Sequence, residues 1–151
     1  MRVTKRTNIA LRLLMFCAVQ PDRLVTKAEV AARCNASENH LGQIIHQLAL
    51  LGFVNTRRGR KGGLALAMPA SEINIGAVFR AIEAPVPMAE CFADADNTCP
   101  LITCCLLRPA LTAAAEAFYG TLDRITLATL TSGNTRLERL LCLDVPVECA
   151  A

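Results

Sequence analysis

The 151-residue sequence contains no uninterrupted apolar stretch near the roughly 20 residues of a membrane span, although hydrophobic residues make up 53% of it. It also lacks a C-x-x-C pair, a glycine-rich nucleotide loop and a visible nucleophile–base arrangement, so nothing in it supports an enzyme. No small-residue cleavage site follows its basic and then apolar start, which Thr4, Thr7, Asn8 and Arg12 interrupt. We therefore expect an amphipathic first helix of a cytoplasmic protein, where clustered cysteines are more often metal ligands or redox groups than disulfides.

Charge is distributed unevenly along the chain. Residues 1–63 carry eleven Lys and Arg side chains against three acidic ones, a balance of +8, whereas residues 64–151 carry five against ten, a balance of −5. A basic half favours a polyanionic partner, because each Lys or Arg placed on a phosphate releases condensed counterions. A solvated surface would explain the charge equally well, so the prediction depends on where the cations fall.

Two short helices joined by a tight turn are predicted in the basic half. Thr26 can cap the first helix, and Glu29 completes a capping box. The turn is Cys34-Asn35-Ala36, after which Ser37 caps a second helix that runs from Glu38 to about Leu51. This arrangement predicts a helix-turn-helix unit whose second helix enters the major groove of DNA. The residues of this unit expected to contact DNA are Thr26, Ser37, Asn39, His40 and Gln43.

A β-hairpin is predicted directly after the second helix. Residues 53–56 alternate like a strand, residues 57–63 form a turn with three glycines, and residues 64–66 return. The four cations of the turn are Arg57, Arg58, Arg60 and Lys61, and no acidic partner lies in the segment. These features favour the wing of a winged helix, which contacts phosphate or a narrow minor groove, over an ordinary solvated hairpin.

The C-terminal half is predicted to contain a short core helix and a long apolar one. The stretch that begins at Ser71 leads into a helix through Ile82, and a helical pattern then runs from Leu106 to about Thr129. Pro109 falls in the first turn, where a missing N–H costs little. A helix of this length on a winged helix usually pairs with its twofold mate, so we expect a homodimer, with packing inside one chain as the alternative.

Four cysteines lie within fifteen residues between these two helices: Cys91, Cys99, Cys104 and Cys105. Their gaps of seven and then four or five residues lack the paired C-x₂₋₄-C pattern that is typical of tetrahedral zinc. Iron–sulfur clusters accept wider spacing on a loop. Since Cys104 and Cys105 are adjacent, we expect one to be a ligand and the other a neighbouring or packed thiol.

With these motifs, the chain resembles the Rrf-type iron–sulfur winged-helix transcriptional repressors over nearly its whole length. The resemblance rests on residues 3–12, on the wing segment 58–66 with Pro69-Ala70, and on segment 88–92 with Cys99-Pro100-Leu101 and Cys105. The last group is most similar to the branch of the rhizobial iron regulator RirA. The nitric-oxide-sensitive NsrR and the cluster-biogenesis regulator IscR are more distant branches.

The resemblance implies a mainly α fold with a small β-hairpin wing and a long dimerisation helix. It also implies a C-x₇-C-x₅-C ligand set, here Cys91, Cys99 and Cys105, for a 4Fe–4S cluster, with 2Fe–2S as the alternative. In NsrR-type members an aspartate from the partner's first helix can complete the cluster, but this chain has Asn8 at the matching position. The fourth ligand therefore stays open among Asn8, Cys104, Glu90, Asp94, Asp96, solvent and a small thiol.

The expected organisation has four parts. They are a winged helix-turn-helix domain at residues 1–84, a cluster-binding loop at 85–105, a dimerisation helix at 106–130, and a C-terminal helix and tail at 131–151. The resemblance implies repression of iron-homeostasis genes through cluster-controlled binding to double-stranded operator DNA. A nitric-oxide- or redox-sensing repressor is the alternative, and a cluster-free thiol-redox regulator or a zinc-stabilised DNA-binding module also stays open.

Overall fold

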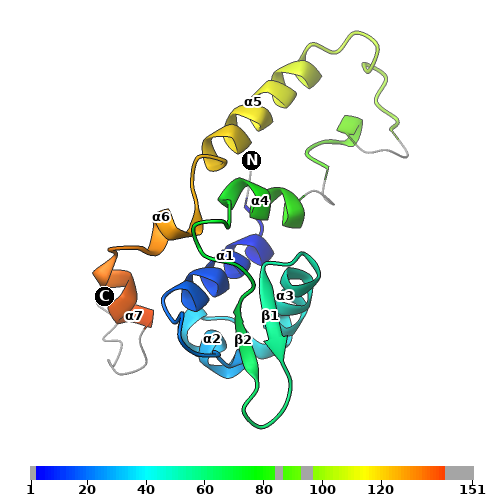
Figure 1. Cartoon of the computed structure of the whole chain (residues 1–151). Helices are drawn as coiled ribbons and strands as arrows, with labels where there is room; N and C mark the ends of the chain where they lie inside the picture. Colours follow the sequence, from blue (N-terminus) through cyan, green and yellow to red (C-terminus); the bar gives the residue numbers. More distant parts are fainter. Residues whose placement is uncertain (1–2, 84–86, 93–96, 142–151) are drawn as a thin grey trace, which may run out of the picture.

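The computed structural model describes residues 3–83, 87–92 and 97–141 (Figure 1). Its elements in chain order are α1 (Lys5–Ala18), α2 (Lys27–Cys34), α3 (Glu38–Leu50), β1 (Val54–Arg57), β2 (Gly63–Leu66), α4 (Ile75–Glu83), η1 (Glu90–Phe92), α5 (Leu107–Leu122), α6 (Leu127–Thr131) and α7 (Thr135–Leu141). The predicted mainly helical fold with a β-hairpin is confirmed. Most elements form one body, and α5 projects from it as an arm (Figure 1). No helix in the described ranges is both long and apolar enough to span a bilayer.

Helix α1 lies at the centre of the body. Seven of its residues are buried, including Leu13, Leu14 and Phe16, which are fully enclosed. The helix packs against α2, α3, α4, α6 and β2. The buried stripe of α3, formed by Leu41, Ile44 and Leu48, faces the same core, as its helical spacing predicts.

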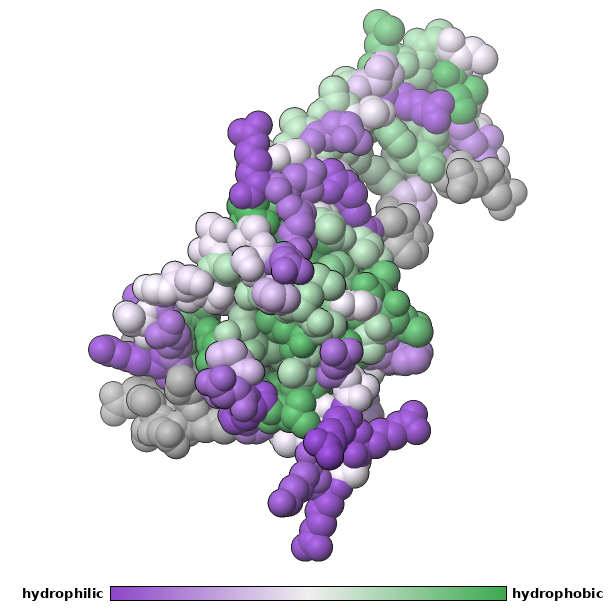
Figure 2. All heavy atoms as spheres, viewed as in Figure 1, coloured by the Kyte–Doolittle hydropathy of each residue, from purple (hydrophilic) through white to green (hydrophobic). Residues whose placement is uncertain are grey.

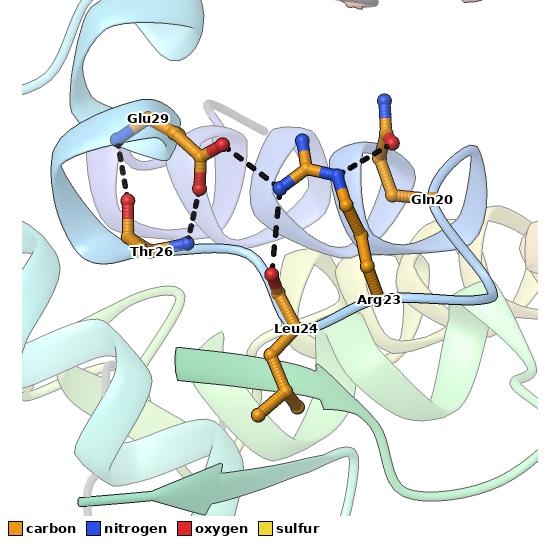
Figure 3. Close-up of polar contacts among 5 residues, drawn as sticks. All are labelled: Gln20, Arg23, Leu24, Thr26 and Glu29. Carbon is orange, nitrogen blue, oxygen red and sulfur yellow. Dashed lines mark hydrogen bonds and ion pairs between the residues drawn. The ribbon is translucent and has the colours of Figure 1, made fainter. Parts of the chain in front are cut away.

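The predicted capping box of α2 is present (Figure 3). The Thr26 hydroxyl accepts a hydrogen bond from the Glu29 backbone N–H at 3.2 Å, and the Glu29 carboxylate accepts one from the Thr26 N–H at 2.5 Å. Arg23 donates to the same carboxylate at 2.8 Å and to Gln20 at 3.0 Å. Arg23 is therefore committed to supporting the start of α2.

The turn between α2 and α3 also follows the sequence signal. Asn35 has φ = 49°, in the left-handed region that asparagine tolerates better than most residues. Ser37 then caps α3 by accepting a hydrogen bond from the His40 backbone N–H at 3.4 Å. These two positions set the direction in which α3 leaves the turn.

The hairpin is antiparallel, with Val54 opposite Leu66 and Arg57 opposite Gly63. Its second strand is attached to the body because Val25 and Leu64 exchange backbone hydrogen bonds of 2.8 and 2.9 Å. A Cβ at Gly63 would lie 2.7 Å from the Val25 carbonyl oxygen, so this close approach requires glycine. The base of the wing is thus fixed while its tip extends away from the core.

The prediction of one helix from Leu106 to about Thr129 is wrong in its extent. Helix α5 ends at Leu122, and a four-residue link, 123–126, leads to the separate helix α6. The link pairs with the segment before α4, because the Ile75 N–H donates to the Ile125 carbonyl at 2.9 Å and the Leu127 N–H donates to the Ile73 carbonyl at 2.8 Å. These bonds replace the ones that a continuing helix would make, and α6 packs against α1.

The start of α1 is joined to the end of α4 by one carboxylate. Glu83 accepts hydrogen bonds from the Thr4 backbone N–H at 3.1 Å, from the Thr4 hydroxyl at 2.8 Å and from the buried Thr7 hydroxyl. The first turn of α1 has no acidic residue of its own and carries Lys5 and Arg6. Glu83 therefore supplies the negative charge that stabilises a helix N-terminus.

This contact predicts a pH-dependent contribution to stability. Burial alone would raise the pKa of Glu83, but hydrogen bonds from Thr7 and Thr4 outweigh it and lower the pKa below its ordinary value. The unfolded chain therefore takes up the proton first as the pH falls, so the stabilisation is present above the ordinary glutamate pKa and is lost below it. We expect Glu83→Gln to lower the free energy of unfolding by roughly 1 kcal/mol at pH 7, with a smaller difference from the native protein at pH 4.

Urea unfolding at the two pH values measures this difference. Glu72→Gln is the control, because Glu72 is an exposed carboxylate outside the contact. A loss at pH 4 as large as that at pH 7 would contradict the role of the Glu83 charge.

Candidate DNA-binding surface and cysteine segment

The structure places most of the predicted DNA-contacting residues of α3 on one exposed face. Ser37, Asn39 and Gln43 are exposed at the start of the helix, and the opposite face is buried in the core. Side chains at the N-terminal end of a recognition helix are the ones that reach base edges in this class of motif. The individual base contacts remain predictions.

His40 lies differently from its neighbours. It lines an open hollow of about 240 Å³ together with Lys5 and Ile9 of α1 and the turn residues 35–37. Its Nε2 atom is buried and has no hydrogen-bond partner within the described part of the chain. His40 therefore lies at the edge of α3 that faces α1. It is next to the exposed face formed by Ser37, Asn39 and Gln43 but is not part of it.

The tip of the wing is a cluster of exposed cations. Arg57, Arg58, Arg60 and Lys61 are all exposed, and none forms an ion pair with any residue that the structure describes. Figure 2 shows hydrophilic side chains projecting from the lower end of the molecule, where Figure 1 places the hairpin tip. Gly59 has φ = 109°, and a Cβ at Gly62 would overlap the Arg57 carbonyl oxygen. Glycines thus permit the sharp turn that holds four unneutralised cations together.

A second hollow, of about 330 Å³, connects the wing with the two helices. It is lined by Thr26 and Lys27 at the start of α2, by Gly42 of α3 and by Arg57 of the wing, among others. The structure thus brings Thr26 and Arg57 to one concave surface, although 31 positions separate them in the sequence. Lys27 contributes less free charge there, because it is paired with Glu38 at 3.2 Å.

The cysteine segment lies between α4 and the arm. Cys91 is in η1, and Cys91, Cys99 and Cys105 are half-buried free thiols. Cys104 is exposed, and its thiol donates to the Leu101 carbonyl at 3.6 Å. Asp94 and Asp96, two of the candidate fourth ligands, fall outside the described residues.

Glu90 closes the loop between the first two cysteines. Its carboxylate accepts hydrogen bonds of 2.6 Å from both the backbone N–H and the hydroxyl of Thr98. These bonds from Thr98 hold the pKa of Glu90 below its usual range. Because Glu90 precedes Cys91 and Thr98 precedes Cys99, one contact fixes the two ends of the loop that carries these cysteines.

The described residues do not form a closed metal site. No three His, Cys, Asp or Glu side chains among them converge in a way that could hold a metal ion. Asn8 lies on the exposed side of α1, in an open hollow whose lining residues are Val3, Thr4, Lys5 and Asn8 itself. The cysteine thiols are therefore suitable donors for an iron–sulfur cluster, but they do not lie close together in the single chain.

Two further cysteines belong to the core. Cys17 and Cys34 are each 3% exposed, and burial, together with the neighbouring Cys34, raises the pKa of Cys17 to about 12. Burial also raises the pKa of Cys34. Since the thiolate is the reactive form, these two thiols are poor redox or metal-binding groups.

Known proteins place this architecture in a family. Residues 3–133 match the family model described as Rrf2, iron-dependent transcriptional regulator. The chain belongs to the Rrf2 family. It is 40% identical over 147 residues to protein aau3 of Rhizobium meliloti (strain 1021), across 97% of this chain and 96% of that protein. It is also 42% identical over 142 residues to the HTH-type transcriptional regulator NsrR of Geobacillus kaustophilus (strain HTA426), across 93% and 97% of the two chains.

Solved structures of two other proteins share the fold. IscR of T. potens superposes with a TM-score of 0.65 at 24% identity, covering 86% of this chain and 85% of that one. CymR of B. subtilis superposes with a TM-score of 0.69 at 23% identity, covering 87% and 97%. The Rrf2-type resemblance is confirmed, and this Rrf2 chain is a DNA-binding transcriptional regulator rather than an enzyme. The finer similarity to the RirA branch stays a prediction.

Two polar contacts of this Rrf2 regulator could not be predicted from the sequence. Glu83 binds residues 76 and 79 positions away, and Arg80 pairs with Asp123, 43 positions away. No local spacing marks either contact. Ile125 continues the helical spacing of the predicted long helix, so the sequence around Asp123 does not mark where that helix ends.

The wing predicts a specific salt dependence. Replacing Arg58 or Arg60 with Ala removes one exposed cation, so binding to any duplex should weaken and the slope of log K against log salt should flatten by about one unit per lost phosphate contact. Titrations of a random-sequence duplex at several salt concentrations measure the slope. Arg136→Ala, which removes an exposed cation from α7, should leave it unchanged. A native slope in both wing variants would mean that the tip does not contact the DNA backbone.

Proposed function

We propose that this Rrf2 regulator is a homodimeric repressor whose binding to operator DNA is controlled by an iron–sulfur cluster held by Cys91, Cys99 and Cys105. The observation that carries the proposal is the position of these thiols. They lie on the segment that joins the DNA-binding body to an arm with an uncovered apolar surface. A change in this segment can therefore act on both the body and the dimer.

The arm supports the dimer. None of the 16 residues of α5 is buried, although the helix is rich in Ala and Leu. Leu107 at its start is 64% exposed, and the preceding Leu106 and Leu101 are 84% and 58% exposed. An exposed apolar surface of this kind favours a partner, and a second copy related by a twofold axis would place two recognition helices on a symmetric operator.

The donor set supports a cluster rather than zinc. Three half-buried thiols on a loop suit iron–sulfur ligation, and the described residues provide no histidine among them. Cys104 is directed to the carbonyl of its own turn, which favours Cys105 as the third ligand. Because the three thiols do not converge in the single chain, ligation requires the segment that carries them to rearrange. When bound, a cluster supplies a centre that oxygen, nitric oxide or iron shortage can degrade.

The same segment is connected to the body through Glu83. This residue ends α4, immediately before the cysteine segment, and holds Thr4 and Thr7 at the start of α1. Helix α1 packs against α3, the recognition helix. A rearrangement of the segment therefore has a short path of contacts, from α4 through α1, to the surface that binds DNA.

Two signals are compatible with this arrangement. The C-x₇-C-x₅-C spacing favours control by iron, by its resemblance to the RirA branch. The 42% identity to a regulator named NsrR favours the nitric-oxide-sensing alternative. The two signals can be distinguished with a bound duplex. An iron chelator should release the duplex if iron is the signal, and a nitric oxide donor should release it if nitric oxide is the signal.

Anaerobic reconstitution tests the ligands. Cys91→Ala, Cys99→Ala and Cys105→Ala should each abolish the visible absorbance of the reconstituted protein, because each removes a thiolate. The matched control Cys104→Ala should retain most of it. A loss in Cys104→Ala as large as in the other three variants would overturn the ligand assignment.

The same samples test control of DNA binding. A duplex selected from a random pool by the reconstituted protein should bind at least about tenfold more tightly with the cluster than without it, a difference of about 1.4 kcal/mol. Equal affinities would rule out a cluster switch. A colourless, metal-free protein whose binding responds to reductant alone would instead support the thiol-redox alternative.

A further inference from the structure

The arm is attached to the body by the short link 123–126. Helix α5 packs on α4 near its own C-terminal end, where Phe118 lies edge-on against Phe79 with ring centroids 5.7 Å apart. The opposite end of α5 extends away from the body (Figure 1). The direction of the arm is therefore decided at one place, where α4, the end of α5 and the link meet.

A bidentate ion pair lies at this place. The Arg80 guanidinium of α4 donates to both carboxylate oxygens of Asp123, at 2.5 and 2.7 Å, and lies 4.6 Å from the centre of the Tyr119 ring of α5. The Asn74 amide donates to the Asp123 backbone carbonyl at 2.6 Å. Arg80 thus bonds the residue that ends the arm and stacks on the arm itself. A two-point guanidinium–carboxylate contact restricts rotation as well as distance.

The space around Asp123 is closed on the α4 side. Gly76 is buried, and a Cβ added to it would overlap the Asp123 carboxylate. Asp123 can therefore approach α4 this closely only because position 76 is glycine. We call Gly76, Arg80 and Asp123 the arm junction.

We propose that the arm junction fixes the angle of α5 relative to the DNA-binding body and so determines which spacing of operator half-sites the dimer accepts. The proposal rests on the dimeric function proposed above. If two arms pair about a twofold axis, their angle sets the separation and rotation of the two recognition helices. Asp123 is then a positioning residue: it contacts no DNA, and it acts through the direction of the arm.

Half-site spacing is a demanding test of such an angle. Inserting or removing one base pair moves a half-site by about 3.4 Å along the duplex and rotates it by about a tenth of a turn. A rigid dimer loses contacts at one half-site under this change. A dimer with freely moving arms can follow it at little cost.

The test uses the full-length protein and a symmetric duplex selected from a random pool, together with duplexes whose central spacer is one base pair longer or shorter. The native protein should bind the altered duplexes at least about tenfold more weakly. In Asp123→Asn and in Gly76→Ala, which break the same contact from opposite sides, this penalty should fall to about threefold or less. Combining the two changes should reduce it no further, because the contact can be lost only once.

Arg124→Ala is the matched control, since Arg124 is an exposed cation of the same link whose side chain forms no ion pair with any described residue. It should keep the native penalty. The side chains of Arg80 and Asp123 are about two-fifths exposed, at 42% and 39%, so Asp123→Asn leaves the core intact, and thermal unfolding verifies this.

The possible results distinguish the role of the arm junction from the proposed dimeric function. A dimer whose junction variants keep the native spacing penalty would overturn the role of the junction and leave the proposed function standing. A native protein that binds single half-sites as a monomer would remove the proposed dimer and the junction's role together.

Discussion

The contact between Arg80 and Asp123 links the two parts of the molecule. The body is held by its own core around α1, but the arm has no buried residue of its own within the described chain. Its direction depends on a few residues near its end, where Phe118 packs on Phe79 and Arg80 bonds Asp123. The guanidinium holds the pKa of Asp123 below its usual range, so the pair stays charged at neutral pH. The contact thus fixes the angle between the body, which carries the DNA-binding surface, and the arm, which carries the apolar surface.

Local sequence signals predicted the body well, because short-range physics determines its boundaries. The capping box of Thr26 and Glu29, the left-handed Asn35 and the Ser37 cap together define the helix-turn-helix unit. The glycines of the wing were predictable for the same reason, since a tight turn and a close approach each require them. The exposed face of α3 then follows from the helical period of its buried residues.

The arm was predicted less well, because contacts between distant residues determine its structure. Leu122 and Ile125 continue the helical spacing of α5, yet the chain leaves the helix after Leu122 to pair with the segment that precedes α4. The geometry of the cysteines was also not predictable from the local sequence. Their spacing indicates a ligand set, whereas the described single chain holds the thiols apart and keeps Glu90 bonded to Thr98. In a cluster-binding dimer, both the ligand geometry and the covered face of α5 would depend on groups beyond one chain.

In the proposed dimer, the arm junction holds the two DNA-binding bodies at a fixed separation. Pulsed electron paramagnetic resonance measures this separation directly, with a nitroxide attached to an unnatural amino acid at position 43 on the exposed face of α3 so that no native cysteine is used. We expect one narrow distance distribution for the otherwise native dimer and a broad one when Asp123→Asn is added. Distributions of equal width in the two proteins would contradict it.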